Sequence, residues 1–460
     1  MTSLDQLTED AVVGLATGDP DWLRDRRQEA YKRWLDQEWP NSRQDEYWRS
    51  TNFTKKIDVT LSVVSDGTDD VDVPDGLVDS LPAASAELRI VDGAVEDATV
   101  PAALAAQGLV VMDLADAARS TEHGEIVRTH LGSLTTSNRD GTGADEDRTI
   151  TLNDAAWTTG AFVHVPSEVE VDEPIGIHLH VTRPGAHLPR VLIVMEHHAR
   201  ATVYLEHTSD LAGDGARALV DQVVEAKVGD GARLHVASIN EWGRGTTHLA
   251  LQKAELARDA TYRHLSVNVG GDTIRLRPEV DLVGPGASCF PLGLYFADEG
   301  QHFDLQPYIR HLAPRATSDV LYKGALQGRS RTIFRGNVYV AANAVGTVTD
   351  ENNRTLILTA GAKADSTPFL EIHCADIRAG HGSATGQIDA RALFYLEARG
   401  IPRDEALRLM VYGFFAEVLD AIETPGVAER ALAHIEREID QADLDAIGVN
   451  DAALAEVGDA

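Results

Sequence analysis

Five segments between residues 199 and 322 decide the fold: ARATVYLEH (199–207), DGARLHVAS (230–238), RDATYRHLS (258–266), PGASCFPLG (285–293) and PRATSDVLY (314–322). Each begins with a turn that ends in a small residue and continues as a run typical of a β-strand. The small residues at successive turns are Ala201, Ala232, Ala260, Ala287, Ala316, Ala344 and Ala364, at intervals of 31, 28, 27, 29, 28 and 20 residues. This near-constant period, with no helix inside a unit, predicts a β-helix whose small residues let successive coils approach closely. A β-sandwich or jelly roll with evenly spaced turns is the alternative.

The same pattern divides the chain into three regions. We expect a helical and mixed α/β region over residues 1–150, a mainly β core over residues 151–385 and a helical domain over residues 386–460. The length of 460 residues is ample for a large buried core.

The flanking regions carry helical signals. Apolar residues recur at helical spacing from Trp22 to Leu35, and a second short helix is expected around Trp48. The acidic, glycine-rich run from Asn138 to Arg148 is predicted to be a solvated loop. Near the other end, two amphipathic helices are expected on either side of residues 399–402, and a third from about Val427 to Ile439.

Composition limits the classes of function. The chain carries 41 Lys and Arg against 73 Asp and Glu, a formal net charge of −32, which argues against nucleic acids and anionic membranes as partners. Only seven of the basic residues are lysine, and an acidic, lysine-poor surface is typical of cytoplasmic proteins of extreme halophiles. We also expect a cytoplasmic location because no signal peptide or apolar stretch of membrane-spanning length is seen. The two cysteines, Cys289 and Cys374, exclude a disulfide framework.

Several catalytic motifs are missing. The sequence contains no GxxxxGK[ST] loop, no GxSxG elbow and no HExxH, so we expect no ATP hydrolysis by this chain itself. Cys289 follows a turn and is predicted to be structural. His197, His198 and the other histidines of the strand region are predicted to face solvent, although they could instead line a groove.

Chemical interest centres on PFLEIHCADIRAGHGSATG (368–386). Strand alternation places Leu370, Ile372 and Cys374 on one face, where Cys374 packs as a small hydrophobe or serves as a reactive thiolate. His381 is expected in a flexible Gly-His-Gly-Ser loop. An accessible imidazole is a good ligand for iron or zinc, although many exposed loop histidines have no function.

The segment from FRGNVYV (334–340) to GFFAEVL (413–419) resembles the conserved C-terminal half of the SufB/SufD family of iron–sulfur cluster assembly. DPDWLRDRRQEAYKRWLDQEWPNSRQDEYWRST (19–51) resembles the start of the SufD branch, and LNDAAWTTGAFVHVPSEVEVDEPIGIHL (152–179) resembles the family's entry into its core. The resemblance implies a right-handed parallel β-helix with helical regions at both ends.

The resemblance also implies a function. Such a chain would be a non-catalytic scaffold that pairs with SufB through the β-helices, while the SufC ATPase docks on its C-terminal helices. A nascent iron–sulfur cluster would form at the SufB interface, with His381 as a candidate ligand and Cys374 as a weak one. Candidate partner contacts are Phe394, Tyr395, Arg399, Gly400, Phe414 and Glu417. A reduced flavin has been linked to the family.

Departures from the family pattern sharpen the expectation. Ala362 and Gly382 stand where SufB carries Cys and Glu, which favours the SufD branch, and Ala379 stands where many SufD chains carry Cys. A SufB-type scaffold and a β-helix polysaccharide lyase or hydrolase are the alternatives. Whether the chain forms a homodimer when SufB is absent is left open.

Overall fold

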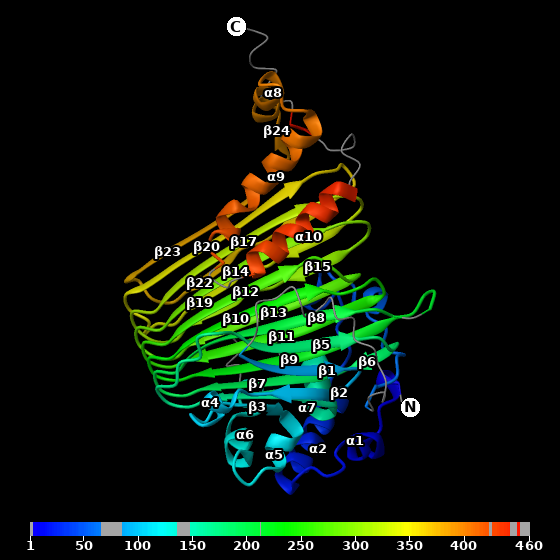
Figure 1. Ribbon diagram of the computed structural model, residues 1–460, viewed down its shortest axis with the longest axis vertical. Coiled ribbons are helices and arrows are strands. Elements are labelled where there is room, and N and C mark those ends of the chain that lie inside the picture. Colours follow the sequence, from blue (N-terminus) through cyan, green and yellow to red (C-terminus); the bar gives the residue numbers. More distant parts are fainter. Residues whose placement is uncertain are drawn as a thin grey trace.

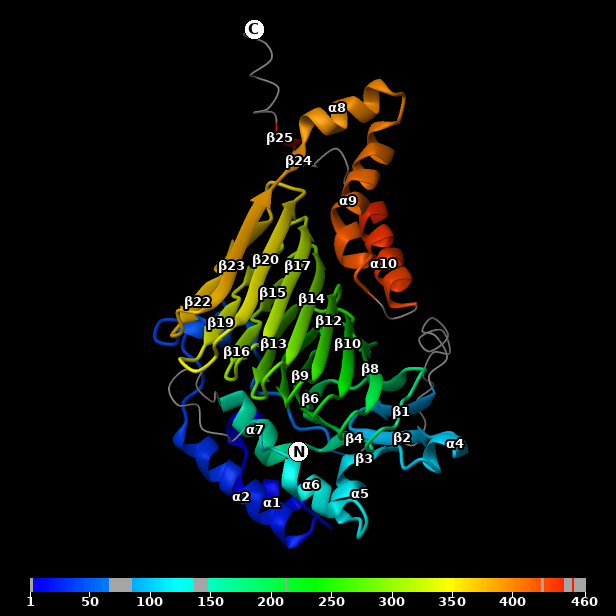
Figure 2. The ribbon, with the colours of Figure 1, turned by 90° about the vertical axis from the view of Figure 1, so that its left-hand side faces the viewer.

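The computed structural model describes residues 3–65, 85–135, 148–211, 213–422, 426–441 and 449–450. Its centre is a parallel β-helix with two faces, each built from one β-sheet (Figures 1 and 2). The ten-stranded sheet contains β1 (Ala86–Val91), β2 (Ala94–Thr99), β5 (Ile175–Val181), β8 (Arg200–Ser209), β10 (Arg233–Glu241), β12 (Thr261–Asn268), β14 (Ser288–Ala297), β17 (Thr317–Leu326), β20 (Thr347–Ile357) and β23 (Ile377–Gly386). The predicted β-helix is confirmed.

The second face is a thirteen-stranded sheet. It contains β3 (Val110–Asp113), β4 (Thr159–Val165), β6 (Gly185–His187), β7 (Pro189–Met195), β9 (Ala218–Val228), β11 (Thr246–Leu256), β13 (Thr273–Leu282), β15 (His302–Leu305), β16 (Tyr308–His311), β18 (Arg331–Phe334), β19 (Asn337–Val340), β21 (Lys363–Ser366) and β22 (Phe369–Ile372). The chain alternates between the two sheets from β8 onward, so each coil adds one rung to each face. A separate short pair joins β24 (Ile388–Asp389) to β25 (Val449–Asn450).

The pairing register of the strands shows how the sequence repeat corresponds to the coils of the β-helix. From β5 onward, neighbouring rungs of the ten-stranded sheet are offset by 27 to 33 residues, as in the pairs Thr261–Ser288 and Arg200–Arg233. Five turn alanines immediately before successive strands are completely buried: Ala199, Ala232, Ala260, Ala287 and Ala316. Small side chains at these turns let the coils stack.

Two of the predicted repeat positions were wrong. Ala201 lies inside β8 and pairs with Leu234, so the turn residue of that coil is Ala199. Ala364 lies in β21 of the other sheet. Both errors arose because a short turn motif does not reveal where the strand begins.

Most helices of the N-terminal region lie on the outer face of the thirteen-stranded sheet, over its earlier strands such as β4, β7 and β9 (Figure 2). The helices of this region are η1 (Leu4–Gln6), α1 (Glu9–Leu15), α2 (Asp21–Asp36), η2 (Glu46–Trp48), α3 (Phe53–Lys56), α4 (Ala102–Ala105), α5 (Leu114–Arg119), α6 (Gly124–His130) and α7 (Arg148–Ala156), with α4 beside β3. The helix predicted over Trp22–Leu35 is α2, whereas the short helix expected at Trp48 is a 3₁₀ turn. The loop predicted from Asn138 lies outside the described residues, except that Arg148 begins α7.

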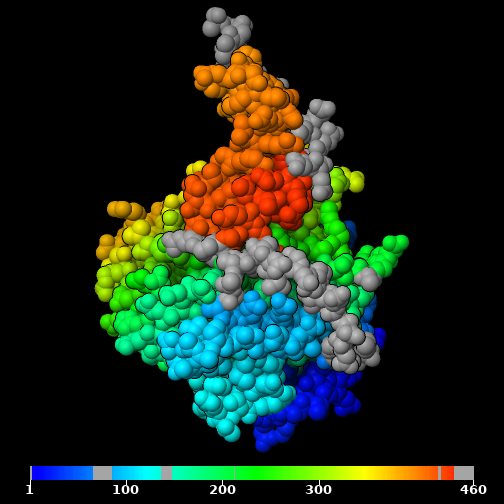
Figure 3. Space-filling model, in the orientation of Figure 1, coloured from blue at the N-terminus to red at the C-terminus, as the bar shows by residue number. Residues whose placement is uncertain are grey.

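Helices α8 (Ala390–Ala398), α9 (Arg403–Leu419) and α10 (Val427–Gln441) follow the last coil. Gly400 has φ +86°, a conformation that only glycine adopts easily, and it ends α8 as predicted. Helices α9 and α10 lie on the outer face of the ten-stranded sheet (Figures 1 and 3), where buried Phe415 and Ile435 share a core with Leu265 and Phe296. None of the helices in the described part of the chain has the length and apolarity needed to cross a bilayer.

A candidate metal-binding end of the β-helix

The last coil of the β-helix has no further coil stacked on it in the described part of the chain. Within the described residues, β23 pairs only with β20, so its outer backbone edge is unpaired. Leu370 and Ile372 pair with buried Val338 and Val340 and share the predicted face, yet Ile372 is 42% exposed because no described strand stacks on it. Phe369 is 55% exposed. An unpaired edge with apolar side chains is suited to association with another chain.

His381 lies in this last coil, on β23 rather than in the predicted loop. The loop prediction was wrong because the neighbouring strand supplies a hydrogen-bonding partner that overrides the low strand propensity of a glycine-rich segment. His381 pairs in register with Glu351 of β20, and side chains of in-register parallel neighbours point to the same face. That face is the interior of the β-helix, so His381 is exposed only because the coil is terminal.

The two glycines beside His381 have a packing reason. A Cβ at Gly380 would lie 2.7 Å from Asp350 Oδ1, and a Cβ at Gly382 would lie 2.7 Å from Asn352 Oδ1. Asn352 Nδ2 donates a hydrogen bond to Asp350 Oδ2 at 2.9 Å, so the two side chains lie together over the glycines. The Gly-His-Gly sequence therefore leaves the imidazole without bulky neighbours on its own strand.

Glu351 is the unusual group beneath His381. Its side chain is 1% exposed, and its Oε2 has no hydrogen-bond partner among the described residues. Gly336 makes room for it, because a Cβ there would clash with Glu351 Oε1. Burial, with a smaller contribution from the nearby Asp350 carboxylate, raises the pKa of Glu351 to about 8, so the carboxyl is mostly protonated at pH 7.

Polar groups line the side of the interior that β20 forms in the last two coils. Tyr295 donates its hydroxyl hydrogen bond to Asn353 Oδ1 at 3.1 Å, and Asn353 Nδ2 donates to Ser366 Oγ at 2.9 Å. Ser383 of the last strand donates to the same Ser366 hydroxyl at 2.7 Å. His381 thus stands at the end of a polar interior. The sequence carried a signal for it, since the inward positions of β20 are all polar: Thr347, Thr349, Glu351, Asn353 and Thr355.

The cysteines lie in apolar surroundings. Cys374 is buried in the same hydrophobic cluster as Ala362, as its first interpretation predicted. Cys289 is completely buried, and burial raises the pKa of its thiol well above the usual range. Ala379 lies two residues before His381 on β23 and brings no ligand atom.

The prediction that these histidines face solvent was right for His197 and His198, which are exposed at a turn, but wrong for most of the others. Seven of them are at most 5% exposed: His180, His187, His207, His248, His264, His302 and His311. Period-two alternation cannot show which face of a strand is inward when both faces are covered. Several form hydrogen bonds inside the protein, such as His264 Nε2 with Gln252 Oε1 at 2.6 Å.

The predicted partner contacts divide into two groups. Phe394 and Tyr395 of α8 are 63% and 56% exposed, and the Arg399 guanidinium donates a hydrogen bond to the Tyr395 hydroxyl at 2.6 Å. Gly400 is exposed beside them. Helix α8 projects beyond the end of the β-helix (Figure 2).

Phe414 and Glu417 hold α9 against the β-helix instead. The Phe414 carbonyl accepts a hydrogen bond from Lys323 Nζ at 2.8 Å, and Glu417 Oε2 lies 2.6 Å from the same amine. The Lys323 hydrogen bond holds the pKa of Glu417 below its usual range.

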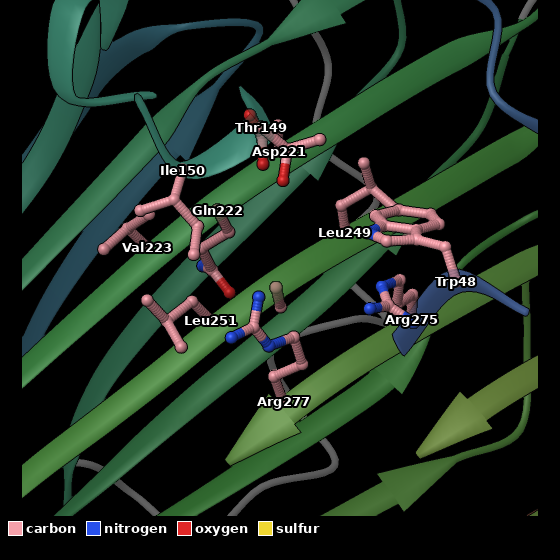
Figure 4. A pocket seen from close by; sticks show the side chains of 11 residues that line it. Trp48, Thr149, Ile150, Asp221, Gln222, Val223, Leu249, Leu251, Arg275 and Arg277 are labelled. Atoms are coloured by element: carbon pink, nitrogen blue, oxygen red, sulfur yellow. The ribbon is translucent and has the colours of Figure 1, made fainter. Parts of the chain in front are cut away.

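Two geometric findings bear on ligands. Within the described ranges, no group of three or more His, Cys, Asp or Glu side chains is placed to hold a metal ion. The cavity in Figure 4 lies between η2, α7 and the outer face of β9, β11 and β13. Its volume of about 10 Å³ has room for roughly one water molecule, so it cannot hold a flavin.

Among the described residues, the parallel β-helix ends in an unpaired strand edge with an exposed imidazole, and helices lie beside it; this arrangement defines a class of β-solenoid protein. The chain belongs to the SufBD family of iron–sulfur cluster assembly proteins. Residues 179–414 match the SUF system FeS cluster assembly, SufBD core domain, and residues 2–177 match the SufBD protein N-terminal region. Membership of the SufBD family argues against the alternative prediction of a β-helix polysaccharide lyase or hydrolase.

Curated relatives agree with this family. An iron–sulfur cluster assembly SufBD family protein of Mycobacterium tuberculosis is 41% identical over 312 residues, covering 65% of this chain and 76% of the relative. SufD of Bacillus subtilis is 27% identical over 428 residues, covering 92% of this chain and 95% of the relative. SufB of the same organism is 27% identical over 312 residues, covering 68% and 65%.

Proposed function

We propose that this chain is a SufD-type, non-catalytic scaffold that holds a nascent iron–sulfur cluster together with SufB. The observation that carries the proposal is the position of His381 on the inward face of the last coil, beside a strand edge that no described strand pairs with. A cluster bound there would take an imidazole nitrogen from this chain and its other ligands from the partner.

Pairing with SufB would use the edge of β23. The open edge offers main-chain hydrogen-bonding groups, and exposed Phe369 and Ile372 offer apolar contact area at the same end. Pairing at this end would cover His381 and exclude water from the cluster. Two copies of this chain could use the same edge when SufB is absent.

Three observations support the SufD type over the SufB type. The similarity to SufD extends over 92% of this chain, against 68% for SufB. Ala362 supplies no thiol at the position of the SufB cysteine. A glutamate in place of Gly382 would displace the Asn352 side chain, because its Cβ would lie 2.7 Å from Asn352 Oδ1.

SufC docking is assigned to α8. The two large exposed side chains Phe394 and Tyr395 stand beyond the end of the β-helix, held in part by Arg399, and suit a partner that supplies ATPase activity.

Cys374 is a weak candidate for the cluster because its thiol is buried among apolar groups. A reduced flavin, if it takes part, binds outside the cavity of Figure 4. We place the complex in the cytoplasm of a salt-adapted organism, from the acidic, lysine-poor composition.

The test is anaerobic reconstitution of the complex with SufB and SufC, comparing wild type with His381→Ala. We expect the variant to fold and to assemble, as measured by circular dichroism and light scattering, but to load markedly less iron and sulfide. His197→Ala is the matched control, because His197 is an exposed turn histidine far from the last coil. Equal loading by the His381 variant and the control would exclude the ligand role. A chain that holds a cluster without SufB would instead be the SufB type.

A further inference from the structure

A groove near α3 is unusually basic for this chain. It has a volume of about 360 Å³ and lies where β9, β11 and β13 begin, against the segment from Lys55 to Leu61. Four of its seven charged lining residues are cationic, whereas acidic residues outnumber basic ones 73 to 41 in the whole chain. Two of the seven lysines of the chain, Lys55 and Lys56, are adjacent here.

Two of the acidic residues of the groove are already engaged. Asp58 Oδ1 accepts hydrogen bonds from the Thr60 backbone and hydroxyl. Asp272 lies 3.4 Å from the Arg244 guanidinium through Oδ1 and accepts a hydrogen bond from the Gly245 backbone through Oδ2. Only Asp272 shares its charge with a guanidinium, and the described lining as a whole carries one more cation than anions, since Glu299 is its third acidic residue.

Three cations remain. Within the described residues, Lys55, Lys56 and Arg217 have no carboxylate within 4 Å. The Lys56 side chain is half-buried, and burial lowers its pKa, with Asp272 opposing the shift and Arg331 adding to it. Holding an ammonium group partly out of water without a partner is costly, and an anion in the groove would offset that cost.

The position of the lysines is fixed by their neighbours. Phe53 and Ile57, on either side of the pair, are 2% and 5% exposed in the N-terminal core. The other large groove gives a contrast, because its Lys227 amine lies 2.8 Å from the Glu255 carboxylate. Cations without an ion pair among the described residues, two of them on a backbone segment anchored by Phe53 and Ile57, thus distinguish the groove at α3, where Lys55 and Arg217 are exposed.

We propose that this groove binds a small phosphate-bearing anion through Lys55, Lys56 and Arg217. Ammonium and guanidinium groups are the usual protein partners of phosphate oxygens. The volume lies in the range of roughly 300–1,000 Å³ that is typical of small-molecule sites. Among the described residues, the lining contains no aromatic side chain on which a base or flavin ring could stack, so inorganic pyrophosphate is the favoured probe.

The experiment is isothermal titration calorimetry of the full chain with inorganic pyrophosphate, ADP and sulfate at constant ionic strength. We expect pyrophosphate to bind, and Lys56→Gln or Arg217→Gln to weaken binding about tenfold each, the loss of one charge-assisted contact. Arg233→Gln is the matched control, since it removes an exposed cation at the start of β10 and should change affinity less than about twofold. Tighter binding of ADP would support the site and identify a nucleotide as the source of phosphate.

Two results would overturn the proposal. One is the absence of pyrophosphate binding to the wild-type chain, and the other is sulfate binding as tight as pyrophosphate binding. Thermal unfolding separates a binding defect from misfolding: Lys56→Gln should unfold at the same temperature as wild type or higher, because it removes an unpaired, half-buried charge.

Discussion

Replacing Glu351 by glutamine should make the protein more stable at high pH. The side chain is 1% exposed, and burial raises the pKa of its carboxyl from 4.5 to about 8. Because the folded pKa is the higher one, the folded state binds more protons than the unfolded state between these two values. Stability therefore falls as pH rises from about 4.5 to 8 and levels off above that.

The size of the effect follows from the shift. A difference of about 3.5 units corresponds to roughly 5 kcal/mol once the carboxyl is ionised in both states, and to about 3 kcal/mol at pH 7. Glutamine keeps the shape of the side chain and cannot ionise. Relative to wild type, Glu351→Gln should thus gain about 4 kcal/mol in free energy of unfolding between pH 5 and pH 9.

Urea denaturation of both chains at pH 5, 7 and 9, at one high ionic strength, measures this difference. Glu170→Gln serves as the control, because Glu170 is exposed and the same substitution there should show little change with pH. A stability difference between wild type and Glu351→Gln that is the same at pH 5 and pH 9 would refute the assignment of Glu351 as a buried, mostly protonated carboxyl.

Two further predictions concern the core and the partner surface. Burial lowers the pKa of His311 to about 4, so the unfolded state binds more protons between pH 6.5 and 4 and stability is lost as pH falls through that window. His311→Gln should remove about 3 kcal/mol of that acid-induced loss in urea unfolding, and an unchanged loss would contradict it. Tyr395→Asp should weaken SufC binding in a pull-down at least about tenfold, whereas Leu35→Asp, which alters a similarly exposed apolar residue (54% against 56%) on α2, should not. Equal retention of SufC by both variants would exclude α8 as the docking site.

The sequence predicted the architecture well because the β-helix repeats. Period, turn residues and helix signals such as Gly400 are local features, and α2, α9 and α10 lie where their apolar spacing placed them. The strand containing His381 was not predicted because it forms by pairing with β20, about 30 residues earlier in the chain. A glycine-rich segment has low strand propensity, so its sequence alone does not indicate this pairing.

The inward face of the strands could not be predicted either. Buried strand histidines and solvent-facing ones have the same alternation when helices cover the outside of both sheets. Glu351 was overlooked for the related reason that a lone glutamate in a polar strand normally faces water. Its burial depends on Gly336, which is 15 residues earlier and in the other half of the coil.

The last coil, on which no described strand stacks, should also be where the molecule opens first. A solenoid is stabilised mainly by contacts between adjacent coils, and a terminal coil has one such neighbour instead of two. β21, β22 and β23 should therefore exchange their backbone amide hydrogens faster than central strands such as β11 and β12. A partner that docks on this edge would act as the missing cap, so the residues around His381 would become rigid only when the complex forms.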